Sequence, residues 1–432
     1  MTPGARVEAA IEVLAELAAR PRPAADALKN WGLAHRFAGS GDRAAIAGLV
    51  YDALRRRASA AYVMGEESPR AIVLGALRLA RALELEAIGK LCSGERHAPA
   101  SLSEAERARL ANANLSGAPP HIAGDYPEWL DSHLTETFGA ERAAEGAALA
   151  ARAPLDLRVN TLKTTVEKAT AALAHLHAKP ARWSPVGLRI ALAAPDKQPP
   201  VTSEPGFKKG WFEVQDEGSQ LAALFAGAAA GEQVLDLCAG SGGKTLALAA
   251  MMANRGQLFA HDEDPRRLAP IHDRLKRAGA RNVQVRSPRG EADVLADLVG
   301  TIDRVLIDAP CTGTGVWRRH PDAKWRMRPG ALEIRVKEQA ALLDQAMRYV
   351  KPGGKIAYVT CSLLEAENGA QVRAFLARTP GWTLVPVAEV ALALGERGEA
   401  LRAAALVTAE GMLFTPRRTE TDGFYISLLT RR

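Results

Sequence analysis

Two cysteines in the chain each follow a stretch that predicts a buried β-strand. Residues 305–308 form a short β-branched run that ends in an acid and meets Pro310, and Cys311 comes directly after that proline. Residues 354–360 form a second run, and Cys361 follows it. In open α/β sheets, ligands bind beyond the carboxyl ends of the strands, so both cysteines stand where a site is expected.

A thiolate at such a position could start chemistry on a pyrimidine ring. It is the most nucleophilic common side chain, and a nearby positive charge or helix start lowers its pKa into the working range. Carbon 5 of cytosine is too electron-poor to attack a methyl donor, but a thiolate that adds to carbon 6 makes carbon 5 nucleophilic. One cysteine would form this adduct while another group removes the proton from carbon 5. The alternative is that both cysteines are small buried core residues, as free cysteines usually are.

Dense motifs surround the two cysteines. They read Asp308-Ala-Pro-Cys-Thr-Gly-Thr-Gly-Val, followed by Arg-Arg-His-Pro-Asp, and later Thr360-Cys-Ser-Leu-Leu and Glu367-Asn368. These motifs resemble those of the RsmB/Nop2/Sun family of RNA 5-methylcytosine methyltransferases. The resemblance implies that Cys361 is the nucleophile, that Cys311 helps to resolve the covalent intermediate and that Asp308 contacts the target base. It predicts an RNA (cytosine-5-)-methyltransferase of the bacterial RsmB type, which acts on 16S rRNA.

A glycine-rich turn follows another predicted strand at residues 233–236, and three ligands compete for it. A P-loop requires glycine where this chain has Cys238, and the fit to a dinucleotide-binding motif is incomplete. We prefer the S-adenosylmethionine loop of a class I methyltransferase, although the family usually has Ala-Pro where this chain has Gly-Ser. The candidate cofactor-binding residues in this loop are Asp236, Cys238, Ala239, Gly240, Ser241, Gly242, Gly243 and Lys244.

Three charged residues complete the predicted site. Residues 256–262 predict a strand that ends in Asp262, whose carboxylate could accept both hydroxyls of a ribose, with Asp264 as the near competitor. Asp308 is expected near the cofactor as well as near the base. Lys244 is a further catalytic candidate, because its charge could lower the pKa of a thiolate or hold the base.

The contact with adenine is harder to place. After the third predicted strand, at residues 282–286, the family usually has an acid, but this chain has Ser287, Pro288 and Arg289. Glu291 and Asp293 are the remaining candidates for that contact.

The order of the predicted elements indicates an α/β fold. Strands and helices alternate across residues 232–378, which argues for a doubly wound sheet. With the resemblance, we expect a Rossmann-like class I methyltransferase domain with seven mostly parallel strands. The element order predicts a small α+β domain before it, and helical periodicity predicts a helical domain before that. The resemblance implies that the small domain is RRM-like and that the helical domain is similar to the RNA-binding NusB antiterminator. The predicted domains are residues 1–140 (all-α, NusB-like), 141–228 (small α+β) and 229–432 (methyltransferase), with a linker region at residues 99–124.

The composition is ordinary for a soluble protein and favours an anionic partner. Lys and Arg outnumber Asp and Glu by 56 to 49, which gives a net charge of +7. We expect RNA as the partner, and small-subunit rRNA by the resemblance. Neither a signal peptide nor an apolar run of about 20 residues is evident, so the chain is predicted to be cytoplasmic, without membrane contact, and monomeric by default. The four cysteines are widely spaced, which argues against disulfides and a metal site.

Two other functions stay open at this point. A DNA cytosine methyltransferase uses the same addition chemistry, although its nucleophile stands in a Pro-Cys-Gln loop and Cys311 is followed by Thr312. A non-catalytic RNA-binding factor with a retired methyltransferase fold is the second alternative, and the intact acids and cysteines argue against it. The candidate RNA contacts, each weighed against an ordinary surface or packing role, are Arg55, Arg56, Arg57, Arg158, Lys163, Trp317, Arg318 and Arg319.

Overall fold

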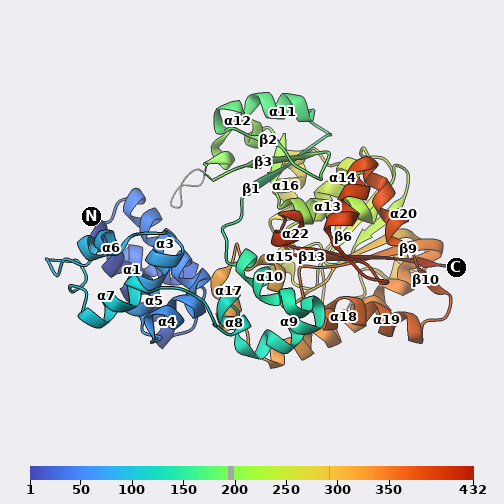
Figure 1. The fold of residues 1–432 in the computed structure, drawn as a ribbon. Coiled ribbons are helices and arrows are strands. Elements are labelled where there is room, and N and C mark those ends of the chain that lie inside the picture. The colour runs from blue at the N-terminus through green and yellow to red at the C-terminus, as the bar shows by residue number, and fades with distance from the viewer. Residues whose placement is uncertain (193–198, 291) are drawn as a thin grey trace. The chain divides into compact units, whose positions relative to one another are not determined.

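The computed structural model describes residues 1–192, 199–290 and 292–432. Contacts divide the chain into two compact units (Figure 1). Unit 1 consists of Met1–Arg152 and Trp317–Arg328, and unit 2 consists of Ala153–Leu192, Pro199–Val316 and Pro329–Arg432. The chain therefore leaves unit 2 shortly after Cys311, adds a short segment to unit 1 and returns. The three predicted domains, residues 1–140, 141–228 and 229–432, remain predictions.

Unit 1 is a bundle of helices, and its described residues form no strand, as the helical periodicity predicted. Apolar residues at helical spacing bury one face of each long helix, so that Val13, Ile46 and Leu74 lie fully inside one core. The likeness of this bundle to NusB stays a prediction. The helices are α1 (Pro3–Ala19), α2 (Ala24–Ala34), α3 (Ser40–Arg55), α4 (Arg57–Met64), α5 (Pro69–Leu79), α6 (Leu85–Leu91), α7 (Glu104–Ala111), α8 (Pro120–Ala123), α9 (Asp131–Phe138), α10 (Arg142–Leu149) and α17 (Pro321–Arg326).

The predicted linker at residues 99–124 contains helices α7 and α8, so this prediction was wrong. At the start of α7, the Ser103 hydroxyl accepts a hydrogen bond from Glu106 N, and the Glu106 carboxylate accepts one from Ser103 N. This capping box starts the helix despite its low apolar content, and Leu110 anchors it in the core.

The segment Trp317–Arg328, which we call the arm, packs within unit 1 and carries α17. The ammonium group of Lys324 is buried and donates to Arg55 O at 2.9 Å and to Asp125 O at 2.6 Å. The indole N–H of Trp325 donates to Leu54 O at 2.6 Å. Because the last carbonyls of a helix lack intrahelical partners, these donors from the arm satisfy the carboxyl end of α3.

Of the three consecutive arginines at the junction of α3 and α4, two also contact the arm. Arg55 is buried and donates to Arg318 O at 3.2 Å, and burial lowers its pKa to about 10. Arg56 pairs with Asp125 at 3.4 Å, and Arg57 lies over an indole ring of the arm. For Arg55, both the RNA contact and the solvated helix face considered above are therefore wrong.

Unit 2 begins with a small antiparallel sheet in the order β2-β3-β1-β4. Its elements mix helices and strands, as the predicted small α+β unit requires. They are β1 (Leu155–Val159), α11 (Val166–Ala172), β2 (Lys179–Pro180), β3 (Gly187–Ile190), α12 (Pro205–Lys208) and β4 (Phe212–Val214). Arg158 on β1 is buried and donates to Gln215 Oε1 at 2.6 Å, and burial lowers its pKa to about 10. Arg158 therefore forms an interior hydrogen bond, and both the phosphate contact and the ordinary surface role considered for it are wrong. Lys163 is exposed, and its contact with phosphate stays a prediction.

The second sheet of unit 2 has the order β11-β12-β13-β9-β8-β5-β6-β7, with β10 paired to β13. Neighbouring strands from β9 to β7 pair in parallel, while the pairings of β13, β12, β11 and β10 are antiparallel. The described sheet has nine strands where we expected seven, because two short strands, β10 and β11, extend its antiparallel edge. The strands are β5 (Gln233–Asp236), β6 (Gln257–His261), β7 (Val283–Arg286), β8 (Ile302–Asp308), β9 (Val350–Thr360), β10 (Trp382–Leu384), β11 (Leu406–Val407), β12 (Met412–Phe414) and β13 (Phe424–Arg431).

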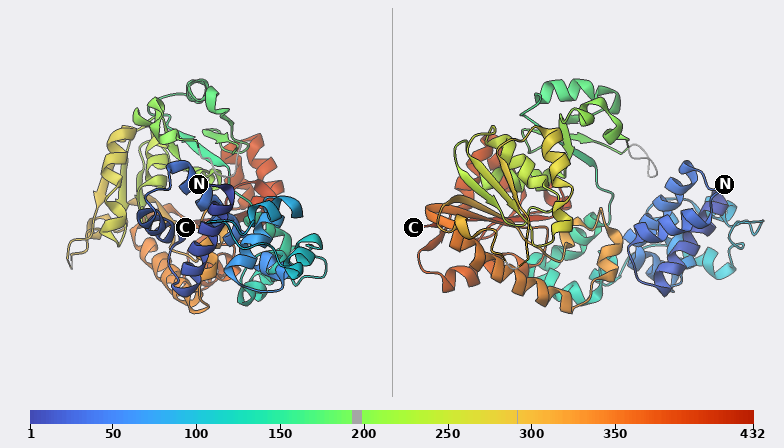
Figure 2. Two further views of the ribbon diagram at one scale, coloured as in Figure 1. Left: turned by 90° about the vertical axis from the view of Figure 1, so that its left-hand side faces the viewer. Right: turned by 180° about the vertical axis from the view of Figure 1, so that it is seen from behind.

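Helices cover both faces of this sheet, as a doubly wound fold requires. Helices α13 (Glu217–Ala226) and α14 (Gly243–Met251) lie on one face, and α18 (Gly330–Tyr349) and α19 (Gly369–Arg378) lie on the other (Figures 1 and 2). The strands between them are nearly continuous apolar runs, so Val234, Leu306 and Ala357 are fully buried. None of the described helices is long and apolar enough to cross a membrane.

Candidate active site

Four neighbouring parallel strands end at one edge of the large sheet and carry the candidate residues. Strands β5 and β8 end in Asp236 and Asp308 themselves. Asp262 directly follows β6, Cys361 directly follows β9, and Cys311 comes three residues after β8. The structure thus brings the candidates from distant parts of the sequence to the carboxyl edge of the sheet, where such folds bind ligands.

The thiols of Cys311 and Cys361 face each other. Their sulfur atoms lie 3.3 Å apart, within the range of a sulfur hydrogen bond, and both side chains are partly exposed. This contact, together with burial, raises the pKa of Cys311 well above its usual range. Cys311 therefore keeps its proton at neutral pH and can donate it toward the sulfur of Cys361.

The glycine loop turns from β5 into α14. Gly240 has φ +51° and Gly242 has φ +87°, a left-handed conformation that favours glycine. A Cβ atom on Gly242 would lie 2.5 Å from Ile271, so helix packing also requires glycine there. Cys238 is buried, and burial raises the pKa of its thiol well above the usual range, so it is an unreactive member of the core.

The rest of the loop is fixed by hydrogen bonds of its backbone and of the Ser241 hydroxyl. Ala239 N donates to His261 O at 2.7 Å, which joins the loop to the end of β6. The carbonyl and hydroxyl oxygens of Ser241 each accept a hydrogen bond from Arg274 at 2.8 Å. Gly243 is the first residue of α14, so the helix begins directly at the loop.

Asp236 is a fully buried carboxylate below this loop. Its Oδ2 atom accepts a hydrogen bond from Thr245 at 2.7 Å, whereas its buried Oδ1 atom has no protein partner among the described residues. Burial is the main reason that the pKa of Asp236 is raised to about 7. A cationic ligand beside Oδ1 would stabilise the ionised form.

Lys244 and Asp308 form an ion pair across the site. The ammonium nitrogen lies 2.6 Å from Asp308 Oδ2, and the lysine side chain is buried while the carboxylate is one-third exposed. The same ammonium lies 5.0 Å from the centroid of the Phe424 ring. Lys244 therefore orients Asp308, which leaves the accessible part of that carboxylate available to a ligand.

Asp262 and its competitor Asp264 have different surroundings. Asp262 is buried; its Oδ2 atom accepts from Gly240 N at 2.9 Å and pairs with Arg267 at 3.2 Å. Asp264 caps the next helix and pairs with Arg266 at the surface. Of the two acids, only Asp262 lies against the glycine loop.

Of the two candidates for the adenine contact, only Asp293 lies among the described residues. Glu291 lies outside the described residues. The Oδ1 atom of Asp293 accepts a hydrogen bond from Leu295 N at 3.0 Å, so this side chain stabilises a local turn. The adenine contact of either acid stays a prediction.

Comparisons with known proteins define the family. The profile of the 16S rRNA methyltransferases RsmB/F matches residues 224–430, and the profile of their ferredoxin-like domain matches residues 126–195. A probable ribosomal RNA small subunit methyltransferase B from Synechocystis is 31% identical over 359 residues, which span 82% of this chain and 76% of the relative. The chain belongs to the RsmB/F family of 16S rRNA methyltransferases. Ribosomal RNA small subunit methyltransferase B from Citrobacter koseri is 34% identical over 311 residues, which span 71% of this chain and 67% of the relative.

Solved structures confirm the class I methyltransferase fold. The crystal structure of PH0851 covers 99% of this chain and 99% of its own, with a TM-score of 0.71 and 25% identity. NSun6 from Pyrococcus horikoshii, solved with SFG, covers 71% of this chain and 98% of its own, with a TM-score of 0.60 and 22% identity, and so shares the fold. As predicted, S-adenosylmethionine is the cofactor of this RsmB/F-family chain.

Sequence reasoning missed several partners of the candidate residues. Thr245, which fixes Asp236, follows Lys244 directly and could have been suspected as a hydroxyl in the first turn of a helix. Phe424 gave no signal, because its contact with Lys244 joins segments that are distant in sequence. Arg267 stands only five residues after Asp262 and could have been suspected as its partner. Glu367 belongs to a quoted motif, but its pattern alone suggested no role.

The predicted RNA contacts of the arm are not supported by its burial. Trp317 is 1% exposed and Arg318 is 4% exposed, so neither presents its side chain to solvent. For Trp317, the packing interpretation was correct and base stacking was wrong. Arg319 is half-buried, and its RNA contact stays a prediction.

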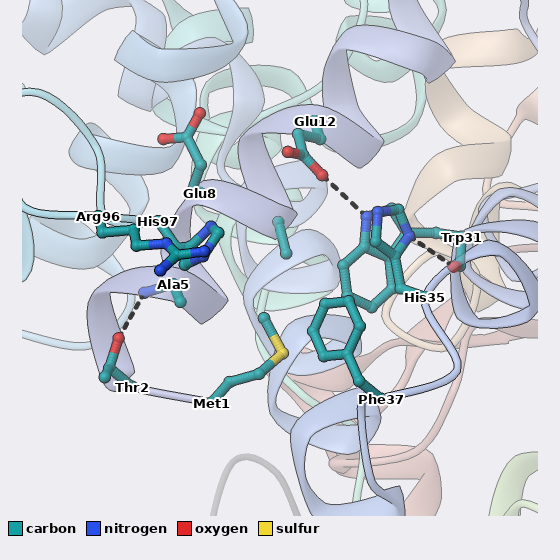
Figure 3. Close-up of a pocket in the computed structure, with 11 residues that line it drawn as sticks. Met1, Thr2, Ala5, Glu8, Glu12, Trp31, His35, Phe37, Arg96 and His97 are labelled. Atoms are coloured by element: carbon teal, nitrogen blue, oxygen red, sulfur yellow. Dashed lines mark hydrogen bonds between the residues drawn. The ribbon is translucent and has the colours of Figure 1, made fainter.

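Unit 1 also has a hollow of its own, with a volume of about 580 Å³ (Figure 3). The rings of Trp31 and His35 stack on one side with centroids 4.2 Å apart, and the indole N–H donates to Glu12 at 2.9 Å. None of the candidate catalytic or cofactor residues lines this hollow, so it is separate from the site described above.

Proposed function

We propose that this chain methylates carbon 5 of a cytosine in RNA through a covalent adduct between Cys361 and carbon 6. The carrying observation is the pair of facing thiols, 3.3 Å apart, at the ends of two strands and beside the ion pair of Lys244 and Asp308. The family's description and the names of its relatives support 16S rRNA, the small-subunit rRNA, as the substrate. To reach both thiols, the base must leave its stack.

The residues present fit S-adenosylmethionine. The cofactor carries positive charge, and the site offers a buried carboxylate oxygen without a protein partner, Asp236 Oδ1, below a glycine loop. We infer that this loop, with Asp236 and Lys244, holds the methionine part, and that Asp262 accepts the ribose hydroxyls. When bound, the cofactor supplies an electrophilic methyl group.

The chain's own groups would divide the remaining work. Cys361, as the thiolate, adds to carbon 6, and the proton on Cys311 can stabilise that thiolate before addition. Asp308, held by Lys244, binds the base edge. After addition, Cys311 must release its own proton to water before it can act as a base. Because its pKa is raised, the resulting thiolate is a comparatively strong base, which suits removal of the proton from carbon 5 before the thioether bond breaks.

Two alternatives fit the structure less well. A DNA cytosine methyltransferase needs one nucleophile on the loop that carries Cys311, whereas here a second thiol faces it from another strand. A non-catalytic RNA-binding factor need not keep a buried carboxylate with an unpartnered oxygen, because such a group lowers stability without a ligand. Measured binding of S-adenosylmethionine separates this alternative from an enzyme.

The deciding experiment incubates purified Cys311→Ala protein with S-adenosylmethionine and deproteinised total RNA. We expect an RNA–protein adduct that survives denaturation, because loss of Cys311 slows its resolution, and a second change, Cys361→Ser, should abolish it. Sequencing of the trapped RNA then identifies the cytosine. Methyl transfer by Cys361→Ala protein, or the absence of both adduct and transfer on free RNA and ribosomal subunits, would contradict the proposal.

A further inference from the structure

One buried carboxylate joins the two loops that carry the thiols. Glu367 is 0% exposed and ends a short 3-10 turn after β9. It accepts hydrogen bonds from the backbone N–H of Thr312, at 2.8 Å, and from the Thr312 hydroxyl, next to Cys311. It also accepts a hydrogen bond from the hydroxyl of Ser362, next to Cys361.

Helix α18 adds a third anchor to this cluster. Gln339 Nε2 donates to Glu367 Oε1 at 3.0 Å and to Pro310 O at 2.9 Å. The carboxylate therefore binds the residue after Cys311 and the residue after Cys361, and Gln339 links it to the residue before Cys311. Hydrogen bonds to an ionised acceptor are among the stronger ones, and several of them together restrict both loops.

A purely structural role is the simpler explanation for a buried, fully bonded acid. Two features point beyond it. The donors belong to the immediate neighbours of both thiols, and they come from segments about 50 residues apart in sequence. The charge of Glu367 also contributes to the raised pKa of Cys311, so this acid influences the thiol pair electrostatically as well as through the loops.

We propose that Glu367 is a positioning residue that fixes the two thiols at a separation from which both can act on one cytosine ring. The inference rests on the two-cysteine function proposed above. Carbons 5 and 6 are adjacent ring atoms, so the groups that act on them must be held to within about 0.5 Å of their working positions. A carboxylate that binds both loops supplies that constraint.

The first test measures the thiol pair without RNA or cofactor. In a glutathione buffer, Cys311 and Cys361 lose two protons and two electrons to form an intramolecular disulfide, while glutathione disulfide is reduced to two glutathione molecules. Peptide mapping of that disulfide gives the effective concentration of one thiol at the other. We expect Glu367→Gln to lower this effective concentration about tenfold or more. The Gln amide places an N–H group where a carboxylate oxygen accepted hydrogen bonds, so some of the donors of Thr312 and Ser362 lose their acceptor.

Two further variants keep the test decisive. Thr312→Val removes one hydroxyl from one loop only, so it should fold if Glu367→Gln does not, and it should lower the effective concentration by about threefold or more. Glu365→Gln is the matched control, since it changes an acid in the same turn whose partner is Arg373. The control should leave the thiol pair unchanged.

Kinetics provide the second readout. Both Glu367→Gln and Thr312→Val should lower kcat. For Glu367→Gln we expect a decrease of about 100-fold, because displacement of reacting groups by about 1 Å has an effect of this size. The KM for S-adenosylmethionine should stay within about twofold of the wild-type value in both variants. In Glu367→Gln protein, alkylation of Cys311 should also begin at lower pH.

The outcomes separate the two proposals. An unchanged effective thiol concentration in folded Glu367→Gln and Thr312→Val proteins refutes the positioning role, even if kcat falls. If the thiol measurement changes as expected but Cys361→Ala protein still methylates RNA, the positioning of the thiols holds and the proposed two-cysteine function fails.

Discussion

Replacing Asp236 by Asn should stabilise the protein above neutral pH and weaken its hold on the cofactor. The carboxyl group is fully buried and its pKa is raised from the usual 3.8 to about 7. Between these two values the folded protein binds a proton that the unfolded chain does not. Stability contributed by the protonated acid is therefore complete below pH 3.8 and is lost as the pH rises to 7.

The size of the effect follows from those two values. At about 1.4 kcal/mol for each pKa unit, the loss is about 4 kcal/mol. The Asn amide keeps the acceptor for Thr245 but places an N–H at the unpartnered Oδ1 position, which costs about 1–2 kcal/mol. The net gain at pH 8.5 is therefore about 2–3 kcal/mol, or a rise in Tm of about 4–10 °C. At pH 5 the wild type has lost about 1.7 kcal/mol, so the variant and the wild type should be about equally stable.

Thermal unfolding of both proteins from pH 5 to pH 8.5 tests the stability, and calorimetric titration with S-adenosylmethionine tests the site. We expect cofactor affinity of the wild type to rise with pH through 7, and that of Asp236→Asn to be about 10–100-fold lower at pH 8 and nearly independent of pH. Thr245→Val is a control that alters the same cluster without removing the charge. A difference in Tm between wild type and Asp236→Asn that does not change with pH would refute the reasoning.

Further predictions concern the arm and the loop after Cys311. Burial lowers the pKa of Lys324 from the usual 10.5 to about 7. Between these two pH values the unfolded chain binds a proton at this lysine and the folded protein does not. The free energy of unfolding should therefore rise by about 4 kcal/mol from pH 7 to pH 10. Lys324→Met should lack this rise, and parallel unfolding curves for the two proteins would contradict the argument. Gly315→Ala should cost about 2 kcal/mol or more and lower methyl transfer, because its Cβ would lie 2.2 Å from Gly423 O. Gly330→Ala, at an open helix start, is the control and should raise the free energy of unfolding by about 0.5–1 kcal/mol. Equal effects at both glycines would show that the close approach of Gly315 to Gly423 is unimportant.

The large sheet and the edge that carries the site were predictable for a specific reason. A parallel strand buried on both faces is a short, nearly continuous apolar run, so β5 and β6 could be located to within one residue at each end and β8 to within three. Because all such strands point the same way, residues just beyond their ends converge, which brought Asp236, Asp262 and Asp308 together. The short edge strands β10 and β11 were missed, because two or three residues show no alternation.

Partner choice between distant segments was not predictable, and the arm shows why. Periodicity identifies which face of α3 is polar, and polar residues normally face water, so Arg55 was expected outside. Its partner Arg318 O stands 263 residues away, and nothing in either local pattern signals the other. Glu367 is a second example. An acid normally faces water, and the partner that holds this one inside the protein, Thr312, stands 55 residues earlier.

Asp236, Lys324 and Glu367 share one property: each is ionisable and each is buried. Removing an ionisable group from water lowers the stability of the folded protein unless specific partners compensate for the lost hydration. For Glu367 and Lys324 the partners are protein groups, and the benefit is the fixed geometry of a loop or helix end. For Asp236 one oxygen has no protein partner among the described residues, so a proton compensates below pH 7 and we expect a ligand to do so above it. Its replacement should therefore separate stability from cofactor binding.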